Sequence, residues 1–197
     1  MEQLHNFKEK TDEELVSLTL EDQDVFLYLV RRYESKLFRY ISRISNVDQD
    51  EVEDILQDIF IKVYKNLNGF DNDLKFSSWI YRITHNEVIS NYRKYKNKVK
   101  INSFDKDIEF AKNIADEFDI EKDLSWVEFK DKIFEILNLM DIKYRDVLVL
   151  KFLEDKSYHE ISDILKKPEG TVGTLINRAK KQFLKILKKE QNYEKDK

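Results

Sequence analysis

The chain has 197 residues and a net charge of −4, and its 41% hydrophobic residues suffice to bury one medium core or two small ones despite 38% charged residues. The absence of Cys excludes a disulfide framework and thiolate metal sites, and three Gly and one Pro are too few for a sheet with many tight turns. No apolar run approaches membrane-spanning length and the first residues lack the apolar core of a signal peptide, so we expect a cytoplasmic protein without membrane insertion.

Three amphipathic helices are predicted before residue 70. Thr11 and Glu14 have the spacing of a capping box, in which each side chain accepts a hydrogen bond from the other residue's backbone N–H, so a short helix should begin there. Apolar residues then recur at helical spacing over 24–45 and over 50–67, which predicts two longer helices. Gly69 follows at the place where a glycine commonly ends a helix.

The outward face of the third predicted helix combines polar residues with one large apolar residue. Its members are Asp54, Gln57, Asp58 and Ile61, with Lys65 beyond them. An apolar side chain among carboxylates indicates a partner surface. Because isolated exposed apolar residues are common on protein surfaces, an unoccupied surface explains Ile61 equally well.

A fourth helix, over residues 79–98, mixes aromatic and cationic side chains, and Ser77 or Ser78 should cap it. Aromatic rings stack on bases and cations contact phosphates, so the mixture suits opened or single-stranded nucleic acid. Three of its apolar residues are better explained as core: Trp79, Ile80 and Ile83. A core role does not explain the basic residues from Arg93 onward.

The sign of the charge changes twice along the chain. After the basic end of the fourth helix, residues 98–125 carry an excess of Asp and Glu with scattered apolar residues, which predicts a tethering linker with weak local helix. A second helical unit begins at Trp126 and ends in a basic helix. The negative net charge therefore does not exclude nucleic-acid binding, because phosphate contacts need only a local positive potential.

The stretch 157–189 has the layout of a helix-turn-helix. Ser157 and Glu160 have capping-box spacing, which begins a short helix. Lys166-Lys167-Pro168 should end it, because Pro disfavours a helical residue before itself and suits the first turn of a new helix. Such a motif places its second helix in the DNA major groove.

The second helix of this motif has two opposite faces. Its apolar stripe consists of Val172, Ile176, Ala179, Phe183 and Leu187. Its polar and cationic stripe consists of Thr171, Thr174, Arg178, Lys181, Lys185 and Lys188, with Asn177 at the edge. A solvated, Lys-rich surface helix would show the same stripes, but the capped helix and short turn before it favour a DNA-binding helix.

Three stretches carry a resemblance to a known family: EVEDILQDIFIKVYKNLNGF at 51–70, FSSWIYRITHNEVISNYRK at 76–94 and YHEISDILKKPEGTVGTLINRAKKQFLKIL at 158–187. In this order they resemble the RNA polymerase sigma factors of the sigma-70 family, specifically the small two-domain extracytoplasmic-function group. The resemblance implies an all-α fold with a region 2-like helical bundle over 1–97 and a region 4-like helix-turn-helix domain over 126–190. An acidic linker over 98–125 would join the domains, and a polar tail would cover 191–197.

The resemblance also implies roles for individual residues. The face that such factors dock on the polymerase clamp corresponds to Asp54, Gln57, Asp58 and Ile61. The residues that contact and help to melt the minus-ten element, including the loop that captures a flipped-out base, correspond to Asn68, Lys75, Ser78, Arg82, Asn86, Tyr92, Arg93 and Lys94. The residues that read the minus-thirty-five element as duplex DNA correspond to Thr171, Thr174, Asn177, Arg178, Lys181 and Lys185.

The partners implied are the core RNA polymerase, through its largest-subunit clamp and its flap, and promoter DNA. An anti-sigma protein is a further expected partner, because the family often has one. No metal site, cofactor or catalytic activity is expected. His5, His85 and His159 are far apart in sequence, and the chain has no phosphate-cradling Gly loop or nucleophile motif.

Three positions depart from the family's pattern. Gly173 stands where relatives usually place a basic residue and Leu175 where they place Arg, so two expected DNA contacts are missing. Gly173 should also cost about 1 kcal/mol of helix stability relative to Ala. Glu87 occupies a usually apolar position that should face the core, and the sequence alone gives it no role.

Two other functions fit parts of the sequence. A dimeric helix-turn-helix regulator with an N-terminal sensing domain would bind a two-fold symmetric duplex without polymerase. A helical adaptor that binds proteins alone would leave the basic stripe of 171–188 unexplained.

Overall fold

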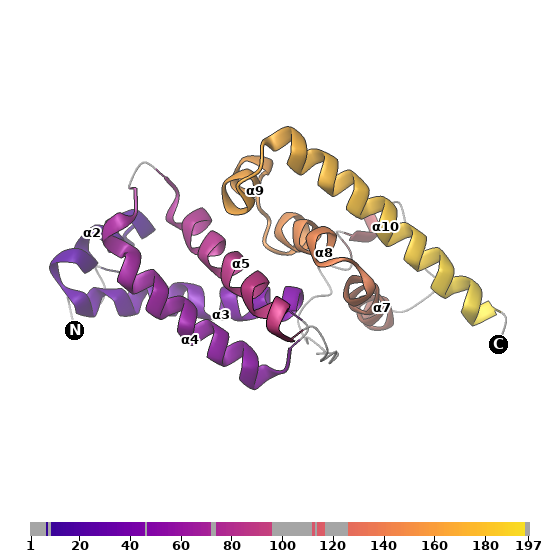
Figure 1. Cartoon of the computed structure of the whole chain (residues 1–197), viewed down its shortest axis with the longest axis horizontal. Coiled ribbons are helices and arrows are strands. Elements are labelled where there is room, and N and C mark those ends of the chain that lie inside the picture. The colour runs from indigo at the N-terminus through magenta and orange to yellow at the C-terminus, as the bar shows by residue number, and fades with distance from the viewer. Residues whose placement is uncertain are drawn as a thin grey trace. The chain divides into compact units, whose positions relative to one another are not determined.

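The structure, a computed structural model, describes residues 7, 9–45, 47–71, 74–95, 112, 114–116 and 126–195. These residues form helices joined by turns and contain no strand, as the all-α prediction requires. The chain divides into two compact units, made essentially of residues 1–98 and 99–197, which Figure 1 shows as the indigo-to-magenta and orange-to-yellow parts of the ribbon. The predicted linker over 98–125 lies outside the described residues except for 112 and 114–116.

The first unit is a bundle built around three long helices. Its elements are α2 (Asp12–Glu21), the short 3-10 helix η1 (Gln23–Val25), α3 (Phe26–Ser45), α4 (Gln49–Asn66), the 3-10 turn η2 (Leu67–Gly69) and α5 (Phe76–Tyr95). Helices α3, α4 and α5 each pack against the other two, and α2 packs on α3. The apolar stripes predicted from the sequence meet at their centre, where Leu37, Ile41, Ile59 and Ile80 are fully buried.

The N-terminal capping box is present as predicted. The backbone N–H of Glu14 donates to Oγ1 of Thr11 at 3.1 Å, and Oε2 of Glu14 accepts from the backbone N–H of Thr11 at 2.7 Å. Asp48 caps α4 in a similar way, because its Oδ1 accepts from the backbone N–H of Glu51 at 3.0 Å. Side-chain oxygens thus satisfy N–H groups that lack a partner within the helix.

Two helix ends differ from the predictions. Helix α5 begins at Phe76, so Ser77 and Ser78 lie within its first turn and do not cap it. The backbone N–H of Phe76 donates instead to Oε1 of Glu13, from α2, at 2.8 Å. Gly69 closes the 3-10 turn η2, and since no glycine among the described residues has a positive φ, the expected left-handed helix end is absent.

The second unit contains the helix-turn-helix. Its elements are α7 (Trp126–Leu139), α8 (Ile142–Leu148), the π-helical turn η3 (Val149–Leu153), α9 (Tyr158–Leu165) and α10 (Glu169–Lys195). Helix α10 packs against α7 and α8. The predicted apolar stripe of α10 is confirmed, because Val172, Ile176, Ala179, Phe183 and Leu187 are all buried.

Local contacts define where α9 begins and ends and where α10 begins. The Ser157–Glu160 capping box begins α9, as predicted. Lys166 ends α9 in the left-handed conformation with a φ of 50°, which is uncommon for a residue other than Gly. The carbonyl of Pro168 accepts from the backbone N–H of Val172 at 3.0 Å, so Pro168 stands just before α10.

Candidate nucleic-acid and partner interfaces

The predicted partner face of α4 is a continuous exposed surface. Its four residues follow the i, i+3, i+4, i+7 spacing of one helix face, and all are exposed: Asp54, Gln57, Asp58 and Ile61. The side chain of Ile61 is 51% exposed, and Tyr64, one turn further along, is 39% exposed. Apolar surface and carboxylates therefore lie side by side on α4.

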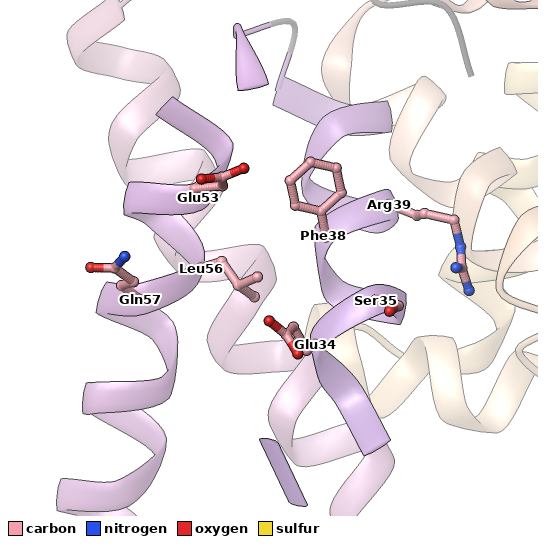
Figure 2. A pocket seen from close by; sticks show the side chains of 7 residues that line it. All are labelled: Glu34, Ser35, Phe38, Arg39, Glu53, Leu56 and Gln57. Carbon is pink, nitrogen blue, oxygen red and sulfur yellow. The ribbon is translucent and has the colours of Figure 1, made fainter. Parts of the chain in front are cut away.

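A hollow of about 690 Å³ lies beside this face, between α3 and α4. Its lining residues are Glu34, Ser35, Phe38 and Arg39 of α3 and Glu53, Leu56 and Gln57 of α4. Figure 2 shows Glu34 and Phe38 on one helix facing Glu53 and Leu56 on the other. Because Gln57 belongs both to the exposed face and to the hollow, the two form one surface feature.

A second pocket, of about 420 Å³, lies where α4, η2 and α5 meet. We call it the Asn86 pocket, and its lining residues are Lys62, Asn66, Gly69, Trp79, Ile83, Asn86 and Glu87. Trp79 and Ile83 supply apolar surface, and the other side chains supply hydrogen-bonding groups. Polar residues thus outnumber apolar ones in the lining of this pocket.

Glu87 lines this pocket, and its partners account for a carboxylate at a position that faces inward. Its Oε2 forms an ion pair with Nζ of Lys62, and its Oε1 accepts a hydrogen bond from Nδ2 of Asn91 at 3.2 Å. The side chain of Glu87 is 13% exposed. The carboxylate is therefore held by partners from both α4 and α5.

The remaining residues predicted to meet the minus-ten element differ in accessibility. Asn68, Lys75 and Asn86 are exposed and Arg82 is partly exposed. Ser78 is only 4% exposed, so the structure gives DNA little access to its hydroxyl. The backbone of α5 includes Tyr92, Arg93 and Lys94, but their side chains lie outside the described part of the structure.

Trp79 is mainly a core residue, as its sequence context indicates. Its side chain is 8% exposed, and its ring centroid lies 5.3 Å from that of Phe70 and 5.6 Å from that of Phe76. The remaining exposed edge contributes to the Asn86 pocket. One residue thus joins the core of the first unit to the wall of the Asn86 pocket.

The polar stripe of α10 is exposed to solvent. Every residue predicted to meet the minus-thirty-five element is exposed: Thr171, Thr174, Asn177, Arg178, Lys181 and Lys185. The opposite face of the helix is buried, so packing fixes the direction in which the stripe points. Thr174 also donates from Oγ1 to the carbonyl of Gly170 at 2.9 Å.

Two contacts in the helix-turn-helix do not follow from the sequence pattern. Nδ1 of His159, on α9, lies 2.9 Å from Oε1 of Glu169, the first residue of α10. Ser162 also donates from Oγ to the carbonyl of Lys167 at 2.6 Å. The first contact joins α9 to α10 and the second joins α9 to the turn between them. The periodicity of a single helix reveals neither.

The described residues offer neither a metal-binding cluster nor a membrane-spanning helix. No group of three or more His, Cys, Asp or Glu side chains could hold a metal ion in the part of the chain that the structure describes. Among the helices described, none has the length and apolar character needed to cross a membrane.

Comparisons with known proteins agree with this arrangement. The family model of sigma-70 region 2 matches residues 29–98, and that of sigma-70 region 4 matches residues 130–183. The ECF RNA polymerase sigma factor SigW of Bacillus subtilis is 37% identical over 173 residues, which cover 85% of this chain and 91% of SigW. The ECF RNA polymerase sigma-E factor of Escherichia coli is 32% identical over 177 residues, which cover 86% of this chain and 91% of that protein.

Solved structures share the fold. CnrH, in a complex with the cytosolic domain of CnrY, superposes with a TM-score of 0.67 at 23% identity, covering 91% of this chain and 98% of CnrH. The sigma factor RpoE of Bartonella quintana, in a complex with the anti-sigma factor NepR, gives a TM-score of 0.60 at 18% identity, covering 83% of this chain and 96% of RpoE.

Proposed function

The chain belongs to the extracytoplasmic-function group of the sigma-70 family of RNA polymerase sigma factors, which act in transcription initiation, and we propose that its three exposed surfaces serve separate steps of that process. The observation that carries the proposal is the exposed stripe of α10, opposite its buried stripe. The matching family models and relatives favour a sigma factor and give no support to the dimeric regulator.

Helix α10 reads the minus-thirty-five element as duplex DNA. Its exposed cations, Arg178, Lys181 and Lys185, neutralise phosphates, and Asn177 and Arg178 have the side chains suited to base edges in the major groove. Because Gly173 and Leu175 offer neither a charge nor a hydrogen-bonding side chain, phosphate contacts by the flanking cations have to supply more of the affinity.

The Asn86 pocket and its surroundings bind the opened minus-ten element. Extruding a base from the stack costs a few kcal/mol, which hydrogen bonds and apolar contacts in a fitted pocket offset. Asn68 and Lys75 flank the pocket in sequence and are exposed, and Arg82 is partly exposed on the same helix as Asn86. The resemblance to the family adds Tyr92, Arg93 and Lys94 to the residues that contact this element.

The exposed face of α4 docks on the polymerase clamp. Asp54, Gln57 and Asp58 supply polar contacts, and Ile61 supplies the apolar contact that a docking surface needs. The second unit contacts the polymerase flap while α10 holds the DNA. The polymerase carries out the chemistry, so the chain needs no active site of its own. The chain acts in the cytoplasm.

An anti-sigma protein regulates the chain by covering these surfaces. The proposal is supported by one of the structural neighbours, RpoE, which was solved with the anti-sigma factor NepR. A partner that covers the face of α4 would prevent docking on the polymerase without touching the DNA-binding side chains.

Two single substitutions test the division of labour. Asn86→Ala should leave the affinity for core polymerase unchanged and lower the rate of open-complex formation by about 5- to 100-fold, the usual cost of one base contact. Gln57→Ala should weaken binding to core polymerase and leave opening by a saturated holoenzyme unchanged. Equal losses in both measurements for both variants would contradict the assignment.

A further inference from the structure

A hollow of about 680 Å³ lies at the corner of the first unit where α2 ends and α3 begins, and none of the three proposed surfaces uses it. We call it the corner hollow, and it is lined by Phe7, residues 22–28, Val30, Arg31 and Tyr64. We propose that the corner hollow is the docking site for a basic amphipathic helix of a partner protein other than the polymerase.

Aromatic side chains supply much of the apolar surface of the corner hollow. The ring centroid of Phe26, the first residue of α3, lies 5.1 Å from that of Tyr64 and 6.4 Å from that of Phe60, both on α4. Two large side chains of the lining remain open to solvent, because Leu27 is 48% exposed and Tyr64 is 39% exposed. Apolar groups gathered on an exposed surface are typical of a site that binds another protein.

Contacts within the chain hold the wall of the hollow beside Tyr28. The ring centroid of Phe7 lies 4.8 Å from that of Tyr28. The segment that follows Phe7 is fastened to α3 by Arg32, whose Nη1 donates to the carbonyl of Lys10 at 3.0 Å and pairs with Oδ1 of Asp12 at 2.6 Å. The hollow is therefore formed before a partner binds, which lowers the cost of docking.

The charge around the corner hollow is negative. Residues 11–30 contain six acidic side chains and no Lys or Arg. Among them, Glu21, Asp22 and Asp24 are exposed and form no ion pair with any residue that the structure describes. Arg31 is the one cation among the described residues of the lining. Such a surface repels nucleic acid and attracts a basic protein partner.

The apolar surface and the acidic rim together specify a basic amphipathic helix. A helix presents apolar side chains at i, i+3, i+4 and i+7 on one face, which enter a hollow, while cations beside that face reach the rim at Glu21 and Asp24. Tyr64 lies one turn beyond Ile61 on α4. The partner would therefore lie beside the exposed face of α4 and leave that face to the polymerase.

The test measures the binding of fluorescein-labelled peptides to the full chain by fluorescence anisotropy. The first probe is a peptide of about 15 residues, long enough to form an isolated helix, with Leu on one face and Lys on the other. The second probe has Glu in place of every Lys. The chain should bind the Lys probe and not the Glu probe, and the affinity should fall as salt screens the exposed carboxylates.

Two variants of the hollow have matched controls. Leu27→Gln should weaken binding of the Lys probe about fivefold or more, because it removes an apolar anchor, whereas Leu74→Gln alters an equally exposed Leu outside the hollow and should not. Asp24→Lys should weaken binding about two- to fivefold, the range of a surface ion pair. Asp116→Lys makes the same change of charge at an exposed residue outside the hollow and should keep the wild-type affinity. Circular dichroism checks the fold of each variant.

Three results would overturn the assignment. If the Lys probe does not bind, or binds all four variants equally, the corner hollow is not its site. If Leu27→Gln lowers the affinity for core polymerase as much as Gln57→Ala does, the hollow belongs to the polymerase interface. If the chain sediments as a dimer that Leu27→Gln dissociates, the occupant is a second copy of the chain. The proposed function is tested separately, by Asn86→Ala and Gln57→Ala.

Discussion

The backbone N–H of Phe76 donates a hydrogen bond to Oε1 of Glu13 at 2.8 Å, so a carboxylate in the first turn of α2 caps the start of α5. Glu13 and Phe76 are far apart in sequence, and the contact fixes where the helix that carries Asn86 begins. The position of the candidate base-binding pocket therefore depends on the short N-terminal helix.

This contact predicts a measurable loss of stability in Glu13→Ala. Removing a side-chain cap leaves a helix N–H unsatisfied, which costs about 1 kcal/mol of unfolding free energy. The loss is measured as the change in unfolding free energy of the first unit in a denaturant titration. Glu13→Gln keeps an oxygen that can accept the same bond and should lose less than Glu13→Ala, whereas equal stability of Glu13→Ala and wild type would contradict the role of the cap.

The capping box of α2 predicts a pH dependence. The hydrogen bond from the backbone N–H of Thr11 lowers the pKa of the Glu14 carboxyl below its ordinary value of 4.5, and the charge of Lys10 acts in the same direction. A pKa that is lower in the folded state contributes stability above the unfolded value, and the contribution is lost as the pH falls through the folded value.

The measurement compares the unfolding free energies of wild type and Glu14→Gln across this range. The advantage of wild type should be constant at neutral pH and should shrink as the pH falls below 4.5. An advantage that stays the same at acid pH would show that the ionised carboxylate does not stabilise the helix.

Gly173→Ala should stabilise the second unit by about 1 kcal/mol, because Gly is the less favourable residue in a helix interior. The structure leaves room for the methyl group: a Cβ at this position would lie 3.6 Å from Cε1 of Tyr158, an ordinary van der Waals contact. Thermal unfolding measures the change. Gly170→Ala, near the helix start with no atom within 4 Å, is the matched control, and destabilisation by Gly173→Ala would contradict the packing described.

The exposed stripe of α10 predicts a change in salt dependence. Lys181→Ala should weaken binding of the holoenzyme to duplex promoter DNA and reduce the slope of log affinity against log salt by about 1, because one phosphate contact is removed. Lys188→Ala, at the far end of the stripe, is the comparison variant. An unchanged slope for Lys181→Ala would place this residue outside the DNA interface.

The double variant Arg178→Glu with Lys181→Glu is a stronger test of the same stripe. Both side chains are exposed, so the fold should persist while acidic groups repel the phosphates. Transcription from a promoter with a minus-thirty-five element should fall by at least tenfold. Unchanged transcript levels with a folded protein would favour the adaptor hypothesis for this helix.

The features predicted correctly from the sequence are those with a local cause. The capping boxes Thr11–Glu14 and Ser157–Glu160 depend on residues three positions apart. The buried stripe of α10 depends on the helix period, which fixes which side chains share a face. In both cases the information lies within a single helix and the residue that caps it.

The features missed have partners far away in sequence. The start of α5 was misplaced because Glu13 supplies the cap that Ser77 or Ser78 was expected to supply. The role of Glu87 was not visible because its partner Lys62 lies on another helix. Helical periodicity shows that position 87 faces inward, but only the packing of α4 against α5 shows that it meets a cation and a pocket.

Run-off transcription tests the central claim most directly. Purified core polymerase would be incubated with a pool of genomic promoter fragments, with and without this protein, and the transcripts sequenced. A sigma factor should produce new start sites that share two upstream elements at a constant spacing, and Asn86→Ala should reduce those transcripts. If the protein adds no polymerase-dependent product, it does not direct initiation under these conditions, and the proposed roles of all three surfaces are contradicted.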